Sequence, residues 1–150
     1  MGGLADELAP GASGLEQLQA LIASGPMPGI PTSLQYALVE VGDGRAVFEG
    51  VPGPHAYNLI GSVHGGYAAT LLDSACGCAV HSKLSAAQAY TTLELKVSYL
   101  RGMTSETGVV RAEGTVLNLG RRVAFAEARL TDTSGKLLAT ATSTLLIVER

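Results

Sequence analysis

Residues 58–80 read NLIGSVHGGYAATLLDSACGCAV, a polar turn marked by glycines that leads into a long segment with almost no charge. Ser62 or His64 can cap a helix that begins near residue 65, and no proline follows before His81. The apolar residues of this segment fall on all sides rather than along one stripe, which is typical of a helix surrounded by protein. The stretch therefore predicts a buried central helix.

Two features of this helix are candidates for chemistry. Asp73 is its one carboxylate, and an ionised group taken out of water must be paired or hydrogen-bonded, which often marks a functional site. The alternative is a structural aspartate that is tied to Ser or Thr hydroxyls. The helix start is the second candidate, because the free N–H groups of Gly65 and Gly66 and the positive end of the helix dipole suit a polarised carbonyl oxygen or an anion.

The spacing of these candidates constrains the assembly. Gly65 and Asp73 are eight residues apart, so at ~1.5 Å per residue they are separated by roughly 12 Å along the helix axis. They cannot both touch one reacting carbon. If both serve one reaction, the aspartate must come from one copy of the chain and the glycine from another, with the two helices antiparallel across a two-fold axis. The spacing thus predicts a homodimer with two shared sites.

Composition narrows the class of protein. The chain has 150 residues, of which 47% are hydrophobic and 15% charged, enough for one globular core. A net charge of −3 and the lack of a basic cluster beyond Arg121-Arg122 argue against nucleic acid or a membrane surface as partner. No apolar run reaches the length of a membrane span, and the first residues show no export signal or lipid anchor. The cytoplasm is the expected location.

No metal site is expected. Cys76 and Cys78 would point about 200° apart around a helix, so they neither pair with each other nor chelate a metal together. The three histidines, His55, His64 and His81, show no metal-ligand spacing. We interpret the cysteines as small buried apolar residues.

The remaining segments indicate one helix before the central one and six strands. Residues 14–24 form a short amphipathic helix, whereas residues 1–13 are expected to be mobile and residues 26–32 to be a proline-punctuated link. The predicted strands, each bounded by turn residues, are 33–41, 45–51, 90–100, 107–119, 122–131 and 136–148. Strands around a single buried helix favour an α+β domain in which an antiparallel sheet curls around that helix. We divide the chain into an N-terminal extension, 1–32, and a domain, 33–150.

At this point the sequence resembles the hotdog-fold acyl-CoA thioesterases of the PaaI-like group, which includes phenylacetyl-CoA and 4-hydroxybenzoyl-CoA thioesterases. The resemblance covers about residues 33–148. It is carried by Asn58 six residues before the His64-Gly65-Gly66 turn, Asp73 nine residues after His64, Ser98-Tyr99-Leu100-Arg101 at a strand end, and Gly120-Arg121-Arg122 followed by Asp132-Thr133-Ser134-Gly135-Lys136. The family commonly has Arg-Pro where this chain has Arg101-Gly102.

The resemblance implies a hotdog fold, in which two chains join their sheets at the 90–100 strand and dimers pair into a homotetramer. It implies hydrolysis of an acyl-CoA to the free acid and CoA, the CoA thioester being the substrate and no cofactor being needed. The Gly65 N–H would polarise the thioester carbonyl, and Asp73 of the partner chain would act as base or nucleophile. The further implied site residues are Asn58 at the carbonyl or water, Thr92 orienting water or the carboxylate, and His64 shaping the turn. Gly66 and Gly120 would bind the substrate, and Arg121, Arg122 and Arg101 would lie near the CoA phosphates.

Less specific interpretations stand beside these roles. Asn58 could serve only a turn, Thr92 only a strand, and His64 only a helix cap, while an arginine pair in a turn is more often a solvated surface. The acyl group stays open between aryl-acetyl, benzoyl and short or medium aliphatic chains. The alternative functions are a hotdog acyl-CoA hydratase or dehydratase, which would place its His and acidic residues differently, and a non-catalytic acyl-CoA-binding module.

Overall fold

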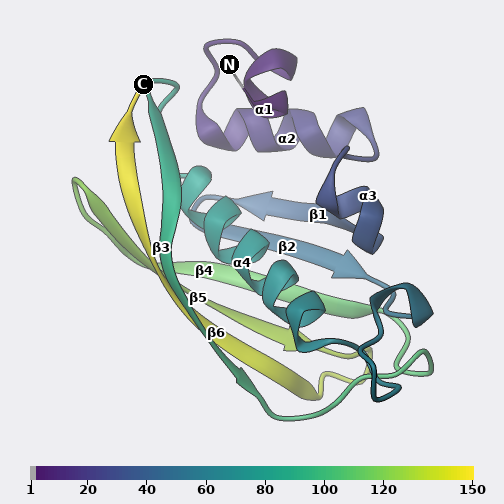
Figure 1. Cartoon of the computed structure of the whole chain (residues 1–150). Coiled ribbons are helices and arrows are strands. Elements are labelled where there is room, and N and C mark those ends of the chain that lie inside the picture. The colour runs from purple at the N-terminus through teal and green to yellow at the C-terminus, as the bar shows by residue number, and fades with distance from the viewer. Residues whose placement is uncertain (1–2) are drawn as a thin grey trace.

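A single curved sheet wraps around one long helix in the computed structural model, which describes residues 3–150 (Figure 1). The helix is α4 (Gly65–His81), and the strands are β1 (Tyr36–Gly42), β2 (Arg45–Gly50), β3 (Gln88–Tyr99), β4 (Val110–Leu119), β5 (Val123–Thr131) and β6 (Leu137–Glu149). All neighbouring strands are antiparallel, in the order β1-β2-β4-β5-β6-β3. This is the α+β hotdog arrangement that the sequence predicts, with β3 at one edge of the sheet.

The core depends on small residues where α4 meets the sheet. Alanines alternate along the inner face of the sheet, so the helix can approach closely; they are Ala46, Ala112, Ala124, Ala126, Ala128, Ala139 and Ala141. The approach is very close at Gly114 of β4, where a Cβ atom would lie 2.3 Å from the carbonyl oxygen of Ala75. Ala75 is completely buried there. The helix backbone itself therefore packs against the strand, which aliphatic side chains at these positions would prevent.

The prediction that α4 is surrounded on all sides is wrong for a single chain. The residues of α4 that face the sheet are buried, but one stripe keeps partial or full exposure: Gly66, Ala69, Thr70, Asp73, Ser74, Cys78 and His81. The sheet stops at its two edge strands, β1 and β3, and leaves this side of the helix open. Asp73 consequently lies on a half-open face and not inside the core.

Three helices precede the sheet, two more than the sequence predicts. The expected helix is α2 (Gly14–Ser24), whose Leu18 and Leu21 belong to the main core. The segment expected to be mobile, 1–13, contains α1 (Leu4–Leu8), where the Asp6 carboxylate accepts from the Gly3 N–H and pairs with Arg150. Residues 1 and 2 of this segment lie outside the described part of the chain. The expected link contains α3 (Ile30–Leu34), because Pro31 is compatible with a first helical turn.

Two strands begin three residues later than predicted, for local reasons. The first strand begins at Tyr36 rather than at residue 33, since α3 occupies 30–34 and Gln35 adopts a left-handed conformation with φ 57°. The fourth begins at Val110 rather than at residue 107, because Thr107 closes a turn by bonding the backbone of Thr104 in both directions. A short 3₁₀ helix, η1 (Pro54–Ala56), leads from β2 toward α4.

Of the N-terminal helices, α2 covers the end of α4 that lies near the C-terminus of the chain (Figure 1). The Gln17 amide donates to Asp6 (3.0 Å), so its carbonyl oxygen faces His81 and accepts from the ring Nε2 (2.8 Å). Burial, and secondarily the charge of Arg150, lowers the pKa of His81 below its ordinary value of 6.5, while Asp6 opposes this shift. Folding therefore favours the neutral form of His81 at this contact between α2 and α4.

We predict that Gly114→Ala destabilises the fold, because its methyl group would overlap the α4 backbone. Overpacking of this kind typically costs about 1–3 kcal/mol. Gly42→Ala is the matched control, since no atom lies within 4 Å of a Cβ atom there. Urea unfolding measures both. Equal stability of the two variants would contradict the close approach of α4 to β4.

We also predict that the free energy of unfolding decreases as the pH falls below 6.5. Folding lowers the pKa of His81, so the unfolded chain binds a proton at His81 more tightly than the folded chain does, and acid favours unfolding. The contribution of His81 to the free energy of unfolding is complete above its ordinary pKa of 6.5 and is lost as the pH decreases through the lowered pKa of the folded state. His81→Gln keeps a donor for Gln17 without titrating. Thermal denaturation between pH 7.5 and 5.5 should show a smaller decrease for this variant than for the wild type, and identical profiles would exclude His81 as the cause.

Candidate active site

Asp73 and Thr92 meet on the open side of α4. The Thr92 hydroxyl donates to Asp73 Oδ1 at 3.0 Å, from the edge strand β3 across to the helix. Both side chains are half-buried. A carboxylate held by one hydroxyl donor and open on its other side remains able to accept a proton from water or to attack an electrophile.

A β-bulge in β3 makes this contact compatible with the rest of the strand. Thr92 pairs with Leu145 and Glu94 with Thr144, so Leu93 is the extra residue. Strict alternation would place Thr92 on the opposite face of the sheet from Leu95 and Val97. The bulge shifts the alternation by one residue, and Thr92 contacts α4 while Leu95 and Val97 still pack against the core.

Two tyrosines and two cysteines lie on or against the turn of α4 that follows Asp73. Tyr36 of β1 shares a hydrogen bond of 3.1 Å with Ser74, and the Tyr90 hydroxyl lies over Gly77, 2.6 Å from where a Cβ atom would be. Burial raises the pKa of Tyr90, and the charge of Asp73 adds to the rise. Burial, with a smaller effect from Asp73, raises the pKa of both the Cys76 and the Cys78 thiols to about 12. The cysteines are therefore protonated at neutral pH and are poor nucleophiles.

The start of α4 offers one free backbone donor. His64 is the N-cap, and its ring Nδ1 accepts from the Gly66 N–H at 2.7 Å. Nδ1 therefore carries no proton, which places the proton of the neutral ring on Nε2. Within residues 3–150 no acceptor meets the N–H of Gly65. Of the two glycine N–H groups in the sequence motif, the one at Gly65 is available to a ligand.

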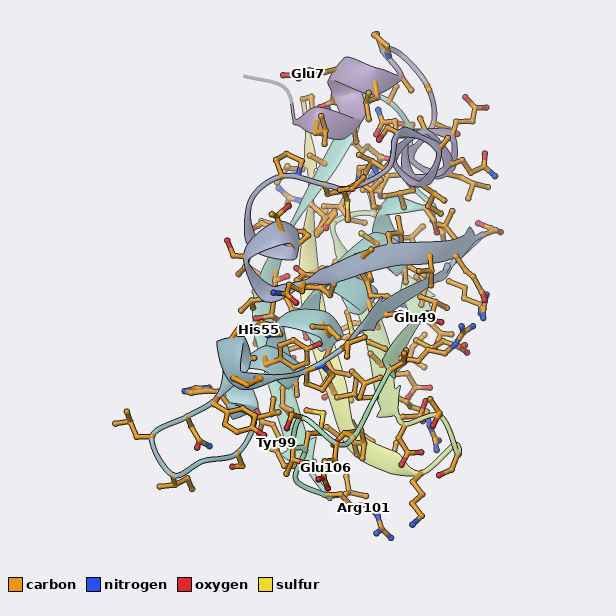
Figure 2. The ribbon with its side chains drawn as sticks, turned by 90° about the vertical axis from the view of Figure 1, so that its right-hand side faces the viewer. Glu7, Glu49, His55, Tyr99, Arg101 and Glu106 are labelled. Atoms are coloured by element: carbon orange, nitrogen blue, oxygen red, sulfur yellow. The ribbon has the colours of Figure 1, made fainter. Side chains whose placement is uncertain are left out.

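A cavity of about 470 Å³ opens at this helix start. It brings together four of the site residues that the sequence suggests, His64, Gly65, Gly66 and Arg101. Tyr99 and Arg101 lie at the same end of the molecule, opposite the end that carries Glu7 of α1 (Figure 2). The apolar part of the lining includes Leu100 and Met103.

Tyr99 lies at the helix start, although the sequence does not suggest it as a site residue. It donates to the Gly65 carbonyl oxygen at 2.7 Å, and its ring lies against the Gly65 backbone. The sequence signal is the position of Tyr99, which continues the inward face of Leu95 and Val97 to the end of β3. Nothing in the sequence shows that this strand end reaches the helix start.

Asn58 lies in the loop before α4 and not in the cavity. Its side-chain oxygen accepts from the N–H groups of Ile60 and Ser62, at 3.0 and 3.2 Å, and its amide donates to the Ser62 hydroxyl. These contacts fix the turn that precedes the helix cap.

The remaining candidates, Gly120, Arg121 and Arg122, lie at the turn between β4 and β5. The two arginines are exposed and line a second cavity of about 500 Å³ with residues 146–149 of β6. Ile147 bonds the Arg122 carbonyl and pairs with Tyr90, so this turn lies beside the beginning of β3, whereas Arg101 follows its end. Within one chain, the two sets of arginines are therefore at opposite ends of the edge strand.

A further cavity, of about 590 Å³, has Tyr36 in its lining. It is lined by residues of the α2–α3 segment and the β1–β2 hairpin, and its lining includes none of the candidate site residues. Residues 3–150 contain no group of three or more His, Cys, Asp or Glu side chains arranged to hold a metal ion. None of their helices is long and apolar enough to cross a membrane.

Comparison with known proteins places this site in a family context. A family model described as the Thioesterase superfamily matches residues 60–139. A curated protein of Halobacterium salinarum, named "Putative esterase VNG_1336C", is 45% identical over 69 residues, which are 45% of this chain and 44% of that protein. The chain thus matches less than half the length of this curated relative.

Solved structures share the fold over most of the chain. A phenylacetic acid degradation-related protein of Ralstonia eutropha is 26% identical, with a TM-score of 0.76 over 86% of this chain and 98% of that one. A hypothetical thioesterase of Streptococcus pneumoniae, solved with coenzyme A, is 25% identical, with a TM-score of 0.69 over 77% of this chain and 90% of that one. Both likenesses extend well beyond the region that the family model matches.

Proposed function

Because the chain belongs to the Thioesterase superfamily, we propose that it is an acyl-CoA thioesterase of the PaaI-like type, with Asp73 as its general base or nucleophile. The substrate is a small aryl-acyl or a short- to medium-chain acyl-CoA. The observation that carries the proposal is the half-buried Asp73, bonded by Thr92 on the one open side of the helix. The names of two solved relatives, one related to phenylacetic acid degradation and one bound to coenzyme A, agree with this substrate class.

The reaction needs an oxyanion donor and a base. In the general-base route, Asp73 takes a proton from water, the hydroxyl adds to the thioester carbon, and the oxygen of the tetrahedral intermediate is stabilised by the Gly65 N–H. The carbon–sulfur bond then breaks, and the CoA thiolate takes the proton back from Asp73. In the nucleophilic route Asp73 attacks the carbon, CoA leaves, and water hydrolyses the resulting anhydride.

We place each site between two chains. Gly65 and Asp73 of one chain are roughly 12 Å apart along α4, so the donor and the base of one reaction come from different protomers. The exposed Leu93 and Tyr99 on the edge strand β3, and the half-exposed stripe of α4, are surfaces that a second copy would cover. A two-fold axis through the middle of β3 would also bring Arg101 of one chain near Arg121 and Arg122 of the other, where both could contact CoA phosphates.

Assembly into a homotetramer and a cytoplasmic site of action belong to the same proposal. His64 supports the Gly65 donor through its contact with Gly66, and Asn58 supports it through the preceding turn. Gly120 gives the arginine turn its shape. Its N–H bonds the Val123 carbonyl, and a Cβ atom at residue 120 would lie 2.8 Å from that oxygen.

We predict that Asp73→Asn lowers kcat for thiol release by at least about 100-fold, because the amide cannot accept the proton or attack. Thr92→Val should lower kcat by about 10-fold, since the carboxylate loses its one hydroxyl donor while strand shape is retained. A disulfide chromogen and a panel of aryl and aliphatic acyl-CoAs measure both variants and identify the acyl group. Binding of acyl-CoA without thiol release by the wild type would instead favour the binding module.

Shared sites predict complementation between two inactive chains. Gly65→Pro removes the free N–H at a helix position where proline is tolerated, although Tyr99 must shift by a few tenths of an ångström. A heterodimer of this chain with Asp73→Asn keeps one intact site, so mixed dimers should recover up to about half of the wild-type kcat per dimer. If each site lay within one chain, the mixture would stay as inactive as either variant alone.

A further inference from the structure

The hydroxyl of Tyr99 makes a contact to which the steps of the proposed reaction assign no role. It donates to the carbonyl oxygen of Gly65 at 2.7 Å. Its ring fills the space beside the Gly65 backbone, where a Cβ atom would be 3.0 Å from the hydroxyl and 3.1 Å from the ring. Tyr99 comes from the end of β3, so this contact links the edge strand to the first residue of α4.

The contact acts on the same peptide group that His64 holds. The peptide between Gly65 and Gly66 has its oxygen bonded by Tyr99 and its N–H bonded by His64 Nδ1, at 2.7 Å each. This peptide is thus fixed from both sides. The neighbouring N–H, that of Gly65, is left as the uncommitted donor at the helix start.

Two consecutive glycines explain why the Gly65–Gly66 peptide needs both contacts, that of Tyr99 and that of His64, which together we call the clamp. Without Cβ atoms, Gly65 and Gly66 have wide conformational freedom, and the N–H groups of the first helical turn have no acceptor within the helix. A small rotation at Gly65 would turn its N–H away from an oxyanion. The ring nitrogen gives the Gly66 N–H an acceptor that the helix does not supply, and the Tyr99 hydroxyl adds a second hydrogen bond to the Gly65 carbonyl beyond its helical one.

We propose that Tyr99 is a positioning residue of this active site, which fixes the Gly65–Gly66 peptide so that the Gly65 N–H points at the oxyanion. The inference rests on the proposed thioesterase function. Tyr99 does not itself stabilise the oxyanion, because its one hydroxyl proton is already donated to Gly65. Its effect therefore appears in the transition state and hardly at all in substrate binding.

The test is Tyr99→Phe, which removes the hydroxyl and keeps the ring against Gly65. We expect kcat to fall about 10-fold or more, with KM and the affinity for an acyl-CoA thioether, which lacks the carbonyl oxygen, changed less than two-fold. Amide hydrogen exchange at Gly66, whose N–H is bonded to His64, should accelerate. Tyr57→Phe is the matched control, since that hydroxyl also bonds a neighbouring loop, at Ser105, but lies outside the cavity.

The outcomes separate the clamp from the function. If the wild type hydrolyses acyl-CoA and Tyr99→Phe keeps kcat within two-fold, the positioning role is wrong. If no acyl-CoA is hydrolysed by the wild type, the proposed function fails first. Should Tyr99→Phe not fold, His64→Ala tests the other contact that fixes the Gly65–Gly66 peptide. The same loss of kcat in His64→Ala, reversed in His64→Asn because asparagine supplies an N-capping acceptor, supports the positioning role. An unchanged kcat in His64→Ala overturns it.

Discussion

The direct contact between the backbone of α4 and Gly114 is the constraint on which the rest of the molecule depends. With no side chain on β4 at that point, the helix lies against the strand at Ala75 and Cys76, and its rotation about its own axis is fixed. Successive residues are separated by 100° around a helix, so a residue two positions before Ala75 points roughly 200° away from it. Asp73 must then face away from the middle of the sheet. The open stripe and its carboxylate follow from packing on the other side.

The same packing explains the unusual composition of the core. A sheet face made largely of alanine offers little apolar area for each residue, and its stabilisation comes from the close approach that small side chains permit. Larger side chains are concentrated on the helix and at the ends of the sheet, as at Leu71, Leu72 and Leu130. A helix held this closely positions a residue on its far face firmly, which a catalytic carboxylate requires.

Sequence alone predicts the fold well, because its signals are local or periodic. The long uncharged segment after His64, the amphipathic segment 14–24 and the glycine-marked turns identify one central helix, an N-terminal helix and six strands. It does not predict α3, where Pro31 was interpreted as part of a link although proline also suits a first helical turn. Nor does apolar content distinguish a helix surrounded by its own chain from one with an open side, because Ala69 and Cys78 are small enough for either environment.

The candidate site is less predictable, because it depends on contacts between distant segments. Asp73 and Gly65 follow from their helix positions, but strict alternation in β3 would place Thr92 and Tyr99 on opposite faces of the sheet. Only the bulge at Leu93 brings both toward α4. A bulge has no reliable sequence signal in TTLELKV, where Leu93 would fit regular alternation equally well. Family resemblance predicts Thr92 as a site residue, whereas only the structure identifies Tyr99.

The edge strand β3 therefore contacts both the carboxylate and the helix start, so a change in the strand affects both. Near its bulge β3 holds the carboxylate of one proposed site, and at its end it holds the helix start that would serve the other site. In the dimer that we propose, the same strand is also the interface. A substitution on β3 that loosened the pairing of two chains would therefore disturb the base and the oxyanion donor together. Effects on assembly and on catalysis can be separated only at hydroxyls such as those of Thr92 and Tyr99, which contact α4 rather than the exposed edge of the sheet.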